Sequence, residues 1–201
     1  MNKIQIVKCP VKKTELDLVL NYAHNAKYNT KEDHIPLHDP LFSNHSVNFD
    51  LVTYGDMPRD VVDVFDLYCK SVQKTVSEIT GKEYDPPILG KSYISKYNTG
   101  AGIGMGYDPT RPENVFVAYV FWNSFFDGGL FRFKDYKLSI ELQPGDYIVF
   151  PETEEYSKEI TPIREGYALI SQLWNAPKGQ SPYPGLKYED IYWGNPLWEN
   201  I

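Results

Sequence analysis

Apolar residues in the first half of the chain recur at helical spacing. Between positions 11 and 27 they stand three or four residues apart, at Leu16, Val19, Leu20 and Ala23. This spacing places them on one face of a helix. Thr14 precedes them and is a residue type that caps helix starts. We therefore predict an amphipathic helix in this segment, with Thr14 as its cap.

A longer helix is predicted from "MPRDVVDVFDLYCKSVQKTVSEITGK". Its apolar residues also fall on one face: Val61, Phe65, Tyr68, Val72, Val76 and Ile79. Pro58 suits a first helical turn, and Gly81 suits the residue that ends a helix. This helix has the strongest pattern in the chain.

The pattern changes to short strand-like runs after residue 90. These runs are "KSYISKY", "VFVAYVFW", "GLFRF", "YKLSIEL", "DYIVF", "KEITPI" and "YALISQLW", separated by turn signals such as "FFDGG" and "QPGD". Regular short strands of this kind predict a sandwich or barrel. Helices followed by strands favour an α+β, mainly β domain with the helices on one side. We expect a helical N-terminal part at 1–90 and a β part at 91–175.

Residues 176–201 are rich in proline and aromatic residues, which disfavours a helix or a long strand. We expect an extended C-terminal arm that lies on its own domain or on a partner protein. Tyrosine and tryptophan are enriched at interfaces. The candidate interaction residues of the arm are Tyr183, Tyr188, Tyr192, Trp193 and Trp198.

Length and composition narrow the possible classes of protein. The 201 residues suit one domain, and the net charge of −7 argues against a nucleic-acid binder. Cys9 and Cys69 stand 60 positions apart and are expected to be free thiols. We find no apolar run long enough to cross a membrane and no secretory leader. The expectation is a soluble protein made in the cytoplasm.

The strand half resembles the 2-oxoglutarate/iron(II)-dependent dioxygenases, in particular the prolyl-4-hydroxylase-like branch found in phages. The resemblance covers about 80 residues, Tyr93 to Trp174, and rests on four segments in the family's order: "YISKYNTGAGIGMGYD", "VFVAYVFWNSFFDGGLFRF", "LQPGDYIVFP" and "EITPIREGYALISQLW". It implies a double-stranded β-helix, or jelly roll. The four glycines of "NTGAGIGMG" also suggest close approach of the backbone to a ligand.

The family holds iron(II) with two histidines and one carboxylate, and binds 2-oxoglutarate with a basic residue. The resemblance places the first histidine on Gly106, the carboxylate on Asp108 and the distal histidine on Lys158. The basic residue falls on Ala168. Asp108 is thus a vestigial ligand position, and the other three positions have been replaced. No histidine follows His45, so no local shift in the alignment restores the set.

Other residues of the chain offer possible replacements for these groups. His34, His38 and His45 lie upstream in a polar segment, and Glu152, Glu154 and Glu155 form an acidic run of the kind that binds hard cations. Lys96, Arg132 and Arg164 were considered for an anion. For each set the expected role is a solvated or ion-paired side chain. We therefore expect no metal, no cofactor-binding residue and no catalytic residue.

A buried carboxylate that has lost its metal requires another counter-charge. We hypothesise that the ammonium of Lys158, or a nearby basic group, occupies the space of the metal and pairs with Asp108. The alternative is that Asp108 is a turn residue before Pro109.

The function that follows is a non-catalytic jelly roll, acting as a structural or protein-binding module. We expect other proteins as partners, with a homo-oligomer as an option, and a place in a phage virion at the neck, tail or connector. The alternative is a divergent but active hydroxylase that uses iron and 2-oxoglutarate. A second alternative is a roll that binds a small molecule or carbohydrate, in a pocket lined by Tyr93, Tyr97, Tyr107, Tyr119 and Trp122.

Overall fold

The computed structural model describes residues 3–30, 49–89, 92–136 and 139–183. Its two α-helices are α1 (Lys13–Asn25) and α4 (Arg59–Thr80). Short 3-10 turns occur at η1 (Tyr54–Asp56) and η3 (Glu154–Tyr156). The strands are β1 (Gln5–Val7), β2 (Asn29–Thr30), β3 (Phe49–Thr53), β4 (Tyr93–Asn98), β5 (Ile103–Gly106), β6 (Phe116–Phe121), β7 (Phe126–Gly128), β8 (Phe131–Phe133), β9 (Ser139–Ile140), β10 (Tyr147–Pro151), β11 (Lys158–Ile160) and β12 (Ile163–Asn175).

The helix ends follow local chemistry. Helix α4 begins directly after Pro58 and ends at Gly81, whose φ of 68° is left-handed, as predicted. The prediction for α1 was wrong at its start, because Lys12 rather than Thr14 is the N-cap residue. The backbone N–H of Lys12 donates to Glu15 Oε2 at 2.7 Å. The carboxylate of Glu15 in the first turn therefore accepts a backbone N–H at the helix start, where the sequence predicted a threonine cap.

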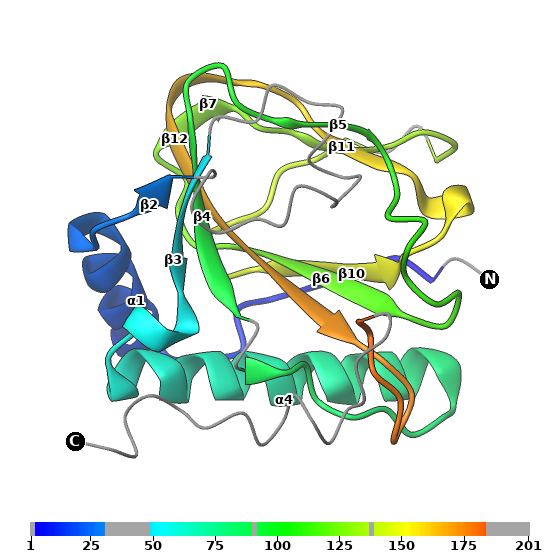
Figure 1. Ribbon diagram of the computed structural model, residues 1–201. Coiled ribbons are helices and arrows are strands. Elements are labelled where there is room, and N and C mark those ends of the chain that lie inside the picture. The colour runs from blue at the N-terminus through cyan, green and yellow to red at the C-terminus, as the bar shows by residue number, and fades with distance from the viewer. Residues whose placement is uncertain (1–2, 31–48, 90–91, 137–138, 184–201) are drawn as a thin grey trace.

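The strands form two antiparallel sheets, arranged as a jelly roll (Figure 1). The large sheet has the order β1-β10-β6-β12-β4-β3-β2, with β7 pairing beside β12. The small sheet has the order β5-β11-β8-β9. Most neighbouring strands, such as β1 and β10, β6 and β12, and β5 and β11, are far apart in sequence, which is the signature of a wound roll rather than a meander. The predicted mainly β fold with flanking helices is confirmed.

The N-terminal part is not only helical, which corrects the expectation for residues 1–90. Strand β1 pairs with β10 at the edge of the large sheet, and β3 pairs with β4 further along the same sheet. β1 has only three residues, which is too short for an alternating pattern to stand out. The large sheet is therefore completed by strands that precede both the long helix and the resemblance.

The two faces of the large sheet have different neighbours. Helix α4 lies across one face, as Figure 1 shows, and packs with it in an apolar cluster. That cluster includes Val61, Phe65, Tyr68, Val72 and Val76 of the helix and Phe116, Ala118, Val120, Trp122, Leu169 and Leu173 of the sheet. The other face meets the small sheet and encloses the roll interior. Alternate residues of β6 and β12 thus serve two separate cores.

The first part of the C-terminal arm lies against its own domain. Pro177 forms an isolated antiparallel bridge with Tyr84, and the backbone N–H of Gly179 donates to Asp85 Oδ2 at 2.6 Å. Half-buried Tyr183 packs against the roll interior. The other predicted interaction residues, Tyr188, Tyr192, Trp193 and Trp198, lie outside the described residues.

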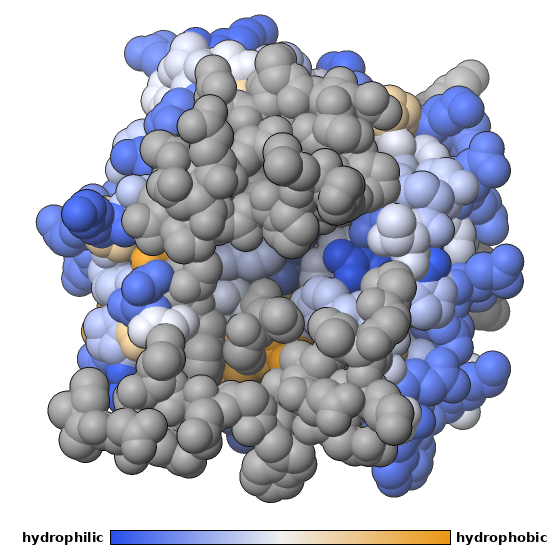
Figure 2. All heavy atoms as spheres, viewed as in Figure 1, coloured by the Kyte–Doolittle hydropathy of each residue, from blue (hydrophilic) through white to orange (hydrophobic). Residues whose placement is uncertain are grey.

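Hydrophilic side chains on the surface and the character of the helices both fit the polar composition of the chain. Hydrophilic side chains gather along the right-hand margin of the face shown in Figure 2. Neither described helix has the length and apolar character needed to cross a bilayer. Cys9 and Cys69 are both free thiols, as predicted, with Cys69 fully buried.

Candidate functional site

The two positions assigned to the iron-binding histidines face each other across neighbouring strands. Gly106 at the end of β5 is the register partner of Lys158 at the start of β11. A Cβ placed on Gly106 would meet no described atom within 4 Å, and the residue has no left-handed φ. Neither backbone conformation nor contact with the described residues therefore requires glycine there. The structure brings these two predicted positions together.

Lys158 is fully buried and forms an ion pair with Glu152. Its Nζ donates to Glu152 Oε1, and both side chains are 0% exposed. The Lys158 ammonium lies 6.0 Å from the ring centroid of Tyr119 and 5.9 Å from that of Phe150. The lysine therefore points into the roll interior, among aromatic rings, with a carboxylate as its counter-ion.

Asp108 takes a different basic partner. Its Oδ2 accepts from Arg111 Nε at 2.7 Å, and the side chains of Asp108 and Arg111 are 1% and 9% exposed. The specific pairing of Asp108 with Lys158 was wrong, but the broader hypothesis of a nearby basic group holds, because Arg111 supplies it. A guanidinium three residues away along the chain reaches the carboxylate more readily than a lysine already paired with Glu152.

The turn role considered for Asp108 is also observed. Asp108 Oδ1 accepts from the backbone N–H of Thr110 at 2.9 Å and from its hydroxyl at 2.6 Å. An aspartate that binds the backbone two residues on stabilises a turn. The carboxylate thus serves both functions at once: one oxygen holds the turn and the other neutralises Arg111.

Glu152 connects the two ion pairs. The backbone N–H of Asp108 donates to Glu152 Oε1 at 2.7 Å, and Lys158 donates to the same oxygen. Glu152 follows directly after β10, so it reaches this point from the large sheet, whereas Lys158 belongs to the small sheet. We call these four residues, Lys158, Glu152, Asp108 and Arg111, the charge network.

Arg111 extends this network to the C-terminal segment. Its guanidinium carbon lies 4.2 Å from the ring centroid of Trp174 and 4.8 Å from that of Tyr183. Its Nη1 also donates to the backbone carbonyl of Pro182 at 3.1 Å. Burial raises the pKa of the Tyr183 hydroxyl. Tyr183, predicted as an interaction residue, therefore contacts its own domain.

Ala168 and two of the tyrosines proposed for a ligand pocket line the roll interior. Ala168 is fully buried on β12, beside its register partner Tyr97 on β4. Tyr119 of β6 belongs to the same cluster. Burial raises the pKa of Tyr97, whose hydroxyl is fully enclosed. Trp122 does not line this space: it faces α4, where its ring lies 5.1 Å from that of Phe65.

The alternative ion-binding residues are engaged elsewhere or lie outside the described residues. Arg132 pairs with Glu159 at 3.5 Å and Arg164 with Asp127 at 2.8 Å. The Lys96 ammonium lies 4.4 Å from the ring centroid of Tyr167.

The acidic run also separates in the structure. Glu152 turns inward to Lys158, exposed Glu155 accepts from Tyr136, and Glu154 is exposed. His34, His38 and His45 lie outside the described residues. Within the described ranges, no group of three or more His, Cys, Asp or Glu side chains is arranged to hold a metal ion.

One glycine of the loop before β5 serves strand packing. A Cβ on Gly102 would come within 2.5 Å of the Ile160 carbonyl oxygen on β11. Gly100, with a φ of 87°, forms the turn between β4 and β5. These glycines therefore allow a tight turn and a close approach of backbone to backbone, rather than the expected approach to a ligand.

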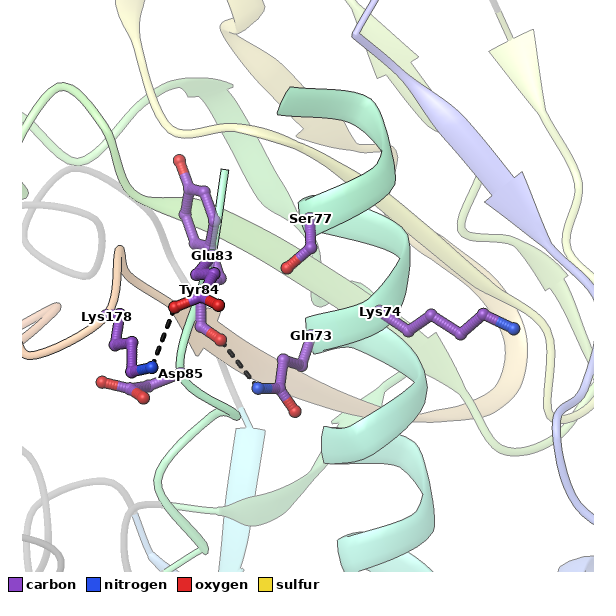
Figure 3. A pocket seen from close by; sticks show the side chains of 7 residues that line it. All are labelled: Gln73, Lys74, Ser77, Glu83, Tyr84, Asp85 and Lys178. Atoms are coloured by element: carbon purple, nitrogen blue, oxygen red, sulfur yellow. Dashed lines mark hydrogen bonds and ion pairs between the residues drawn. The ribbon is translucent and has the colours of Figure 1, made fainter. Parts of the chain in front are cut away.

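A pocket of about 380 Å³ lies beside α4 (Figure 3). It is lined by Gln73, Lys74, Ser77, Glu83, Tyr84, Asp85 and Lys178. Lys178 Nζ pairs with Glu83 Oε2 at 2.8 Å, and Gln73 Nε2 donates to the Tyr84 carbonyl at 2.7 Å. The first contact joins the C-terminal segment to the segment after α4, and the second joins that segment to the helix. The pocket is therefore a polar seam between α4 and that segment, separate from the charge network.

Comparisons of sequence find no matching family profile and no curated relative. Comparison of structure finds many similar chains. One is an oxidoreductase of the 2OG-Fe(II) oxygenase family from Burkholderia pseudomallei, with a TM-score of 0.63 and 13% identity over 90% of this chain and 86% of that one. A Pseudomonas putida prolyl-4-hydroxylase gives 0.61 and 13%, over 88% and 94%. A viral collagen prolyl hydroxylase from Paramecium Bursaria Chlorella virus-1 gives 0.59 and 15%, over 87% and 96%.

The chain has the double-stranded β-helix fold of these oxygenases. At this level of identity the likeness shows the fold alone, and function depends on the site.

The donor set does not fit the iron and 2-oxoglutarate that this fold implies. Gly106 has no ligand atom, and the Lys158 ammonium is a buried cation without a lone pair to offer a metal. Both carboxylate oxygens of Asp108 already accept hydrogen bonds, one from Arg111 and the other from Thr110. Ala168 offers no charge for a carboxylate of 2-oxoglutarate.

Sequence reasoning missed Glu152 and Arg111 as members of this site. Arg111 stands three residues after Asp108, and Glu152 was included in an acidic run, so both were visible in the sequence. What the sequence does not show is that these two acidic and two basic side chains meet, because the tertiary structure brings them together.

Proposed function

We propose that the chain is a non-catalytic jelly roll of dioxygenase-like fold, used as a structural or protein-binding module. The observation that carries the proposal is the charge network. Lys158 and Asp108 stand at two positions where the sequence resemblance places metal ligands, and Glu152 and Arg111 neutralise their charges. A roll built this way has a stable polar centre without a metal.

The burial of these groups supports a structural role. A buried charge is tolerated when it is paired and hydrogen-bonded, and removing its partner is strongly destabilising. Glu152 and Lys158 are fully enclosed, and the adjoining interior is filled by aromatic side chains such as Tyr119, Phe131 and Phe150. Stacked and edge-on contacts join these rings at centroid distances of 5.1 to 5.9 Å. The interior thus resembles a packed core at this point.

A divergent but active hydroxylase is the second candidate. The observation that favours it is the fold, because the similar structures include a prolyl-4-hydroxylase and a viral collagen prolyl hydroxylase. This function requires metal ligands other than those at Gly106 and Lys158. His34, His38 and His45 are the candidates considered from the sequence, and these residues lie outside the described ranges.

Calorimetric titration of the full chain with manganese(II), with and without 2-oxoglutarate, separates the two candidates. Manganese(II) takes the same ligands as iron(II) and does not oxidise during the experiment. The proposal expects no saturable binding of either compound. Saturable metal binding that 2-oxoglutarate strengthens would overturn it and support the hydroxylase. Repeating such a titration with Asp108→Asn would show whether the metal sits at the vestigial position.

The finer proposal is that this module belongs to a larger protein assembly, specifically a phage virion at its neck, tail or connector. It rests on the resemblance to phage-encoded sequences and on the aromatic C-terminal arm. The test is native mass spectrometry of the full chain over a range of concentrations. A closed homo-oligomer would support self-assembly. A monomer at every concentration would remove the homo-oligomer and leave a different protein as the partner.

A further inference from the structure

We propose that Lys158 and Glu152 form an intramolecular amide, an isopeptide bond, that joins the two sheets of the roll. The amine belongs to β11 in the small sheet, and the carboxyl follows β10 of the large sheet. Lys158 Nζ contacts Glu152 Oε1 directly. The proposal goes beyond the proposed function, because it assigns a covalent modification to a pair so far described only as ionic.

The pair is enclosed in a way that separates it from water. Both side chains are 0% exposed, and the rings of Tyr119 and Phe150 lie on the lysine side. Two full charges in such a place carry a large desolvation cost. Transfer of one proton from the ammonium to the carboxylate removes both charges. It leaves a neutral amine, which is a nucleophile, beside a carboxylic acid.

Hydrogen-bond accounting favours the amide over the ion pair. Among the described residues, Glu152 Oε2 has no partner although it is fully buried. The ammonium has three donors, and Glu152 Oε1 is the acceptor that the structure shows for it. The ion pair thus leaves one acceptor and two donors unmatched within the described residues. An amide removes Oε2 and two of the N–H groups, while its carbonyl keeps the hydrogen bond from Asp108.

The reaction balances without any further reagent. One ammonium proton passes to the Glu152 carboxylate through Oε1, the oxygen that Nζ contacts, and the lone pair of Lys158 Nζ then attacks Glu152 Cδ. In the adduct this proton and a second nitrogen proton reach Oε2, and the Cδ–Oε2 bond breaks to release water. No atom is oxidised or reduced. The product is an amide with one N–H, and the only by-product is one water molecule.

The structure supplies one group that assists this step. The backbone N–H of Asp108 donates to Glu152 Oε1 at 2.7 Å. Negative charge develops on this oxygen when the amine attacks, and a fixed N–H donor stabilises it. The turn that holds Asp108 in place, through Thr110 and Arg111, therefore also orients the donor. Asp108 acts here through its backbone, as a positioning residue.

The intact mass of the full chain, measured after denaturation, tests the proposal. We expect a mass lower than that of the sequence by one water molecule. Cleavage after Glu154 or Glu155 then cuts the loop between the two residues. If the bond is present, the two fragments stay joined through Glu152 and Lys158 as one branched peptide. The full sequence mass would overturn the proposal, and so would a lost water that maps elsewhere in the chain.

Two variants sharpen this result. Lys158→Arg keeps the positive charge, but its guanidinium is not nucleophilic, so this variant should have its full sequence mass. Glu152→Gln can still condense, with release of ammonia instead of water, so its product should have the same mass as the linked wild-type chain. If Lys158→Arg does not fold, the wild-type and Glu152→Gln masses still decide the question. A lost water that persists in Lys158→Arg would contradict the assignment.

Discussion

The two faces of the large sheet bury different kinds of side chain, although the same strands form both faces. On the face toward α4, Phe65, Val72 and Trp122 are fully buried in a mainly apolar cluster that contains no ion pair among the described residues. On the face toward the small sheet, the roll encloses full charges, and each must find a partner of opposite sign. Hydrophobic burial is non-directional, whereas a buried charge depends on one particular neighbour.

This difference explains what each face can tolerate. A residue removed from the helix-facing cluster leaves a cavity, and no single second substitution restores the packing. A residue removed from the charge network leaves an unpaired charge, and removing its partner as well relieves that cost. The helix-facing side thus resembles an ordinary domain core. The roll interior differs, because each buried charge there is paired with one particular partner.

A large effect is expected on the helix-facing side. Phe65→Ala should lower the free energy of unfolding by about 3–5 kcal/mol, because a fully buried ring that packs against Trp122 is lost. Denaturant titration of the full chain measures this change. Leu67→Ala, at a side chain that is 40% exposed on the same helix, is the matched control and should cost far less. Equal losses for the two variants would contradict the assignment of this core.

A smaller loss is expected when the second ion pair of the network is broken. Arg111→Met should cost about 2–3 kcal/mol, because buried Asp108 loses a charged hydrogen bond and Tyr183 loses its stacking partner. Limited proteolysis should also cut the C-terminal segment faster. Arg132→Met removes a half-exposed arginine and should change stability by less than about 0.5 kcal/mol. If both variants behave alike, Arg111 has no special role.

Alkaline pH should weaken both faces through their buried tyrosines. Burial raises the pKa of Tyr68 and Tyr147 on the helix side and of Tyr97 in the roll, above the ordinary value of 10.0. The unfolded chain then loses these protons at a lower pH than the folded chain does. The contribution of these tyrosines to the free energy of unfolding is therefore fully present below pH 10.0 and falls as the pH rises above it. Thermal melting at a series of pH values would show this decline, and a flat profile across that range would refute it.

Chemical labelling of the two thiols tests how tightly the helix-facing core is packed, and it is expected to show the smallest effect. Cys69 is fully buried and its pKa is raised by burial, whereas Cys9 is half-buried near the start of the chain. A thiol reagent should label Cys9 in the native chain and both residues after denaturation. Cys9→Ser should leave the native chain unlabelled. Rapid native labelling of that variant would mean that α4 opens more easily than its packing indicates.

The sequence predicted the repetitive parts of the fold more reliably than the site. Helix α4 follows from its apolar face, Pro58 and Gly81, and β6, β10 and β12 follow from long apolar runs. Strands β1 and β5 did not stand out, because one has three residues and the other contains two glycines. Their places depend on pairing with distant strands, which local pattern does not encode.

The site was predicted in part, for a related reason. The resemblance assigned the two histidine positions to Gly106 and Lys158, and the structure places these residues opposite each other. It did not indicate which acid meets which base. Lys158 and Glu152 are six residues apart and meet only because the chain turns between β10 and β11. Charge pairing across such a turn is a property of the tertiary structure, so the sequence pointed to Lys158 as the partner of Asp108 and did not single out Arg111.

The most direct test of this account is a double-mutant cycle on Lys158 and Glu152. Lys158→Met and Glu152→Leu should each lower the free energy of unfolding by at least about 3–5 kcal/mol, since neither variant can form the amide and each leaves one buried charge unpaired. The double variant should be more stable than either single variant, because no charge remains. Denaturant unfolding of the four proteins measures the coupling. Single losses that are small, or that simply add in the double variant, would contradict a charge network in the place of the metal.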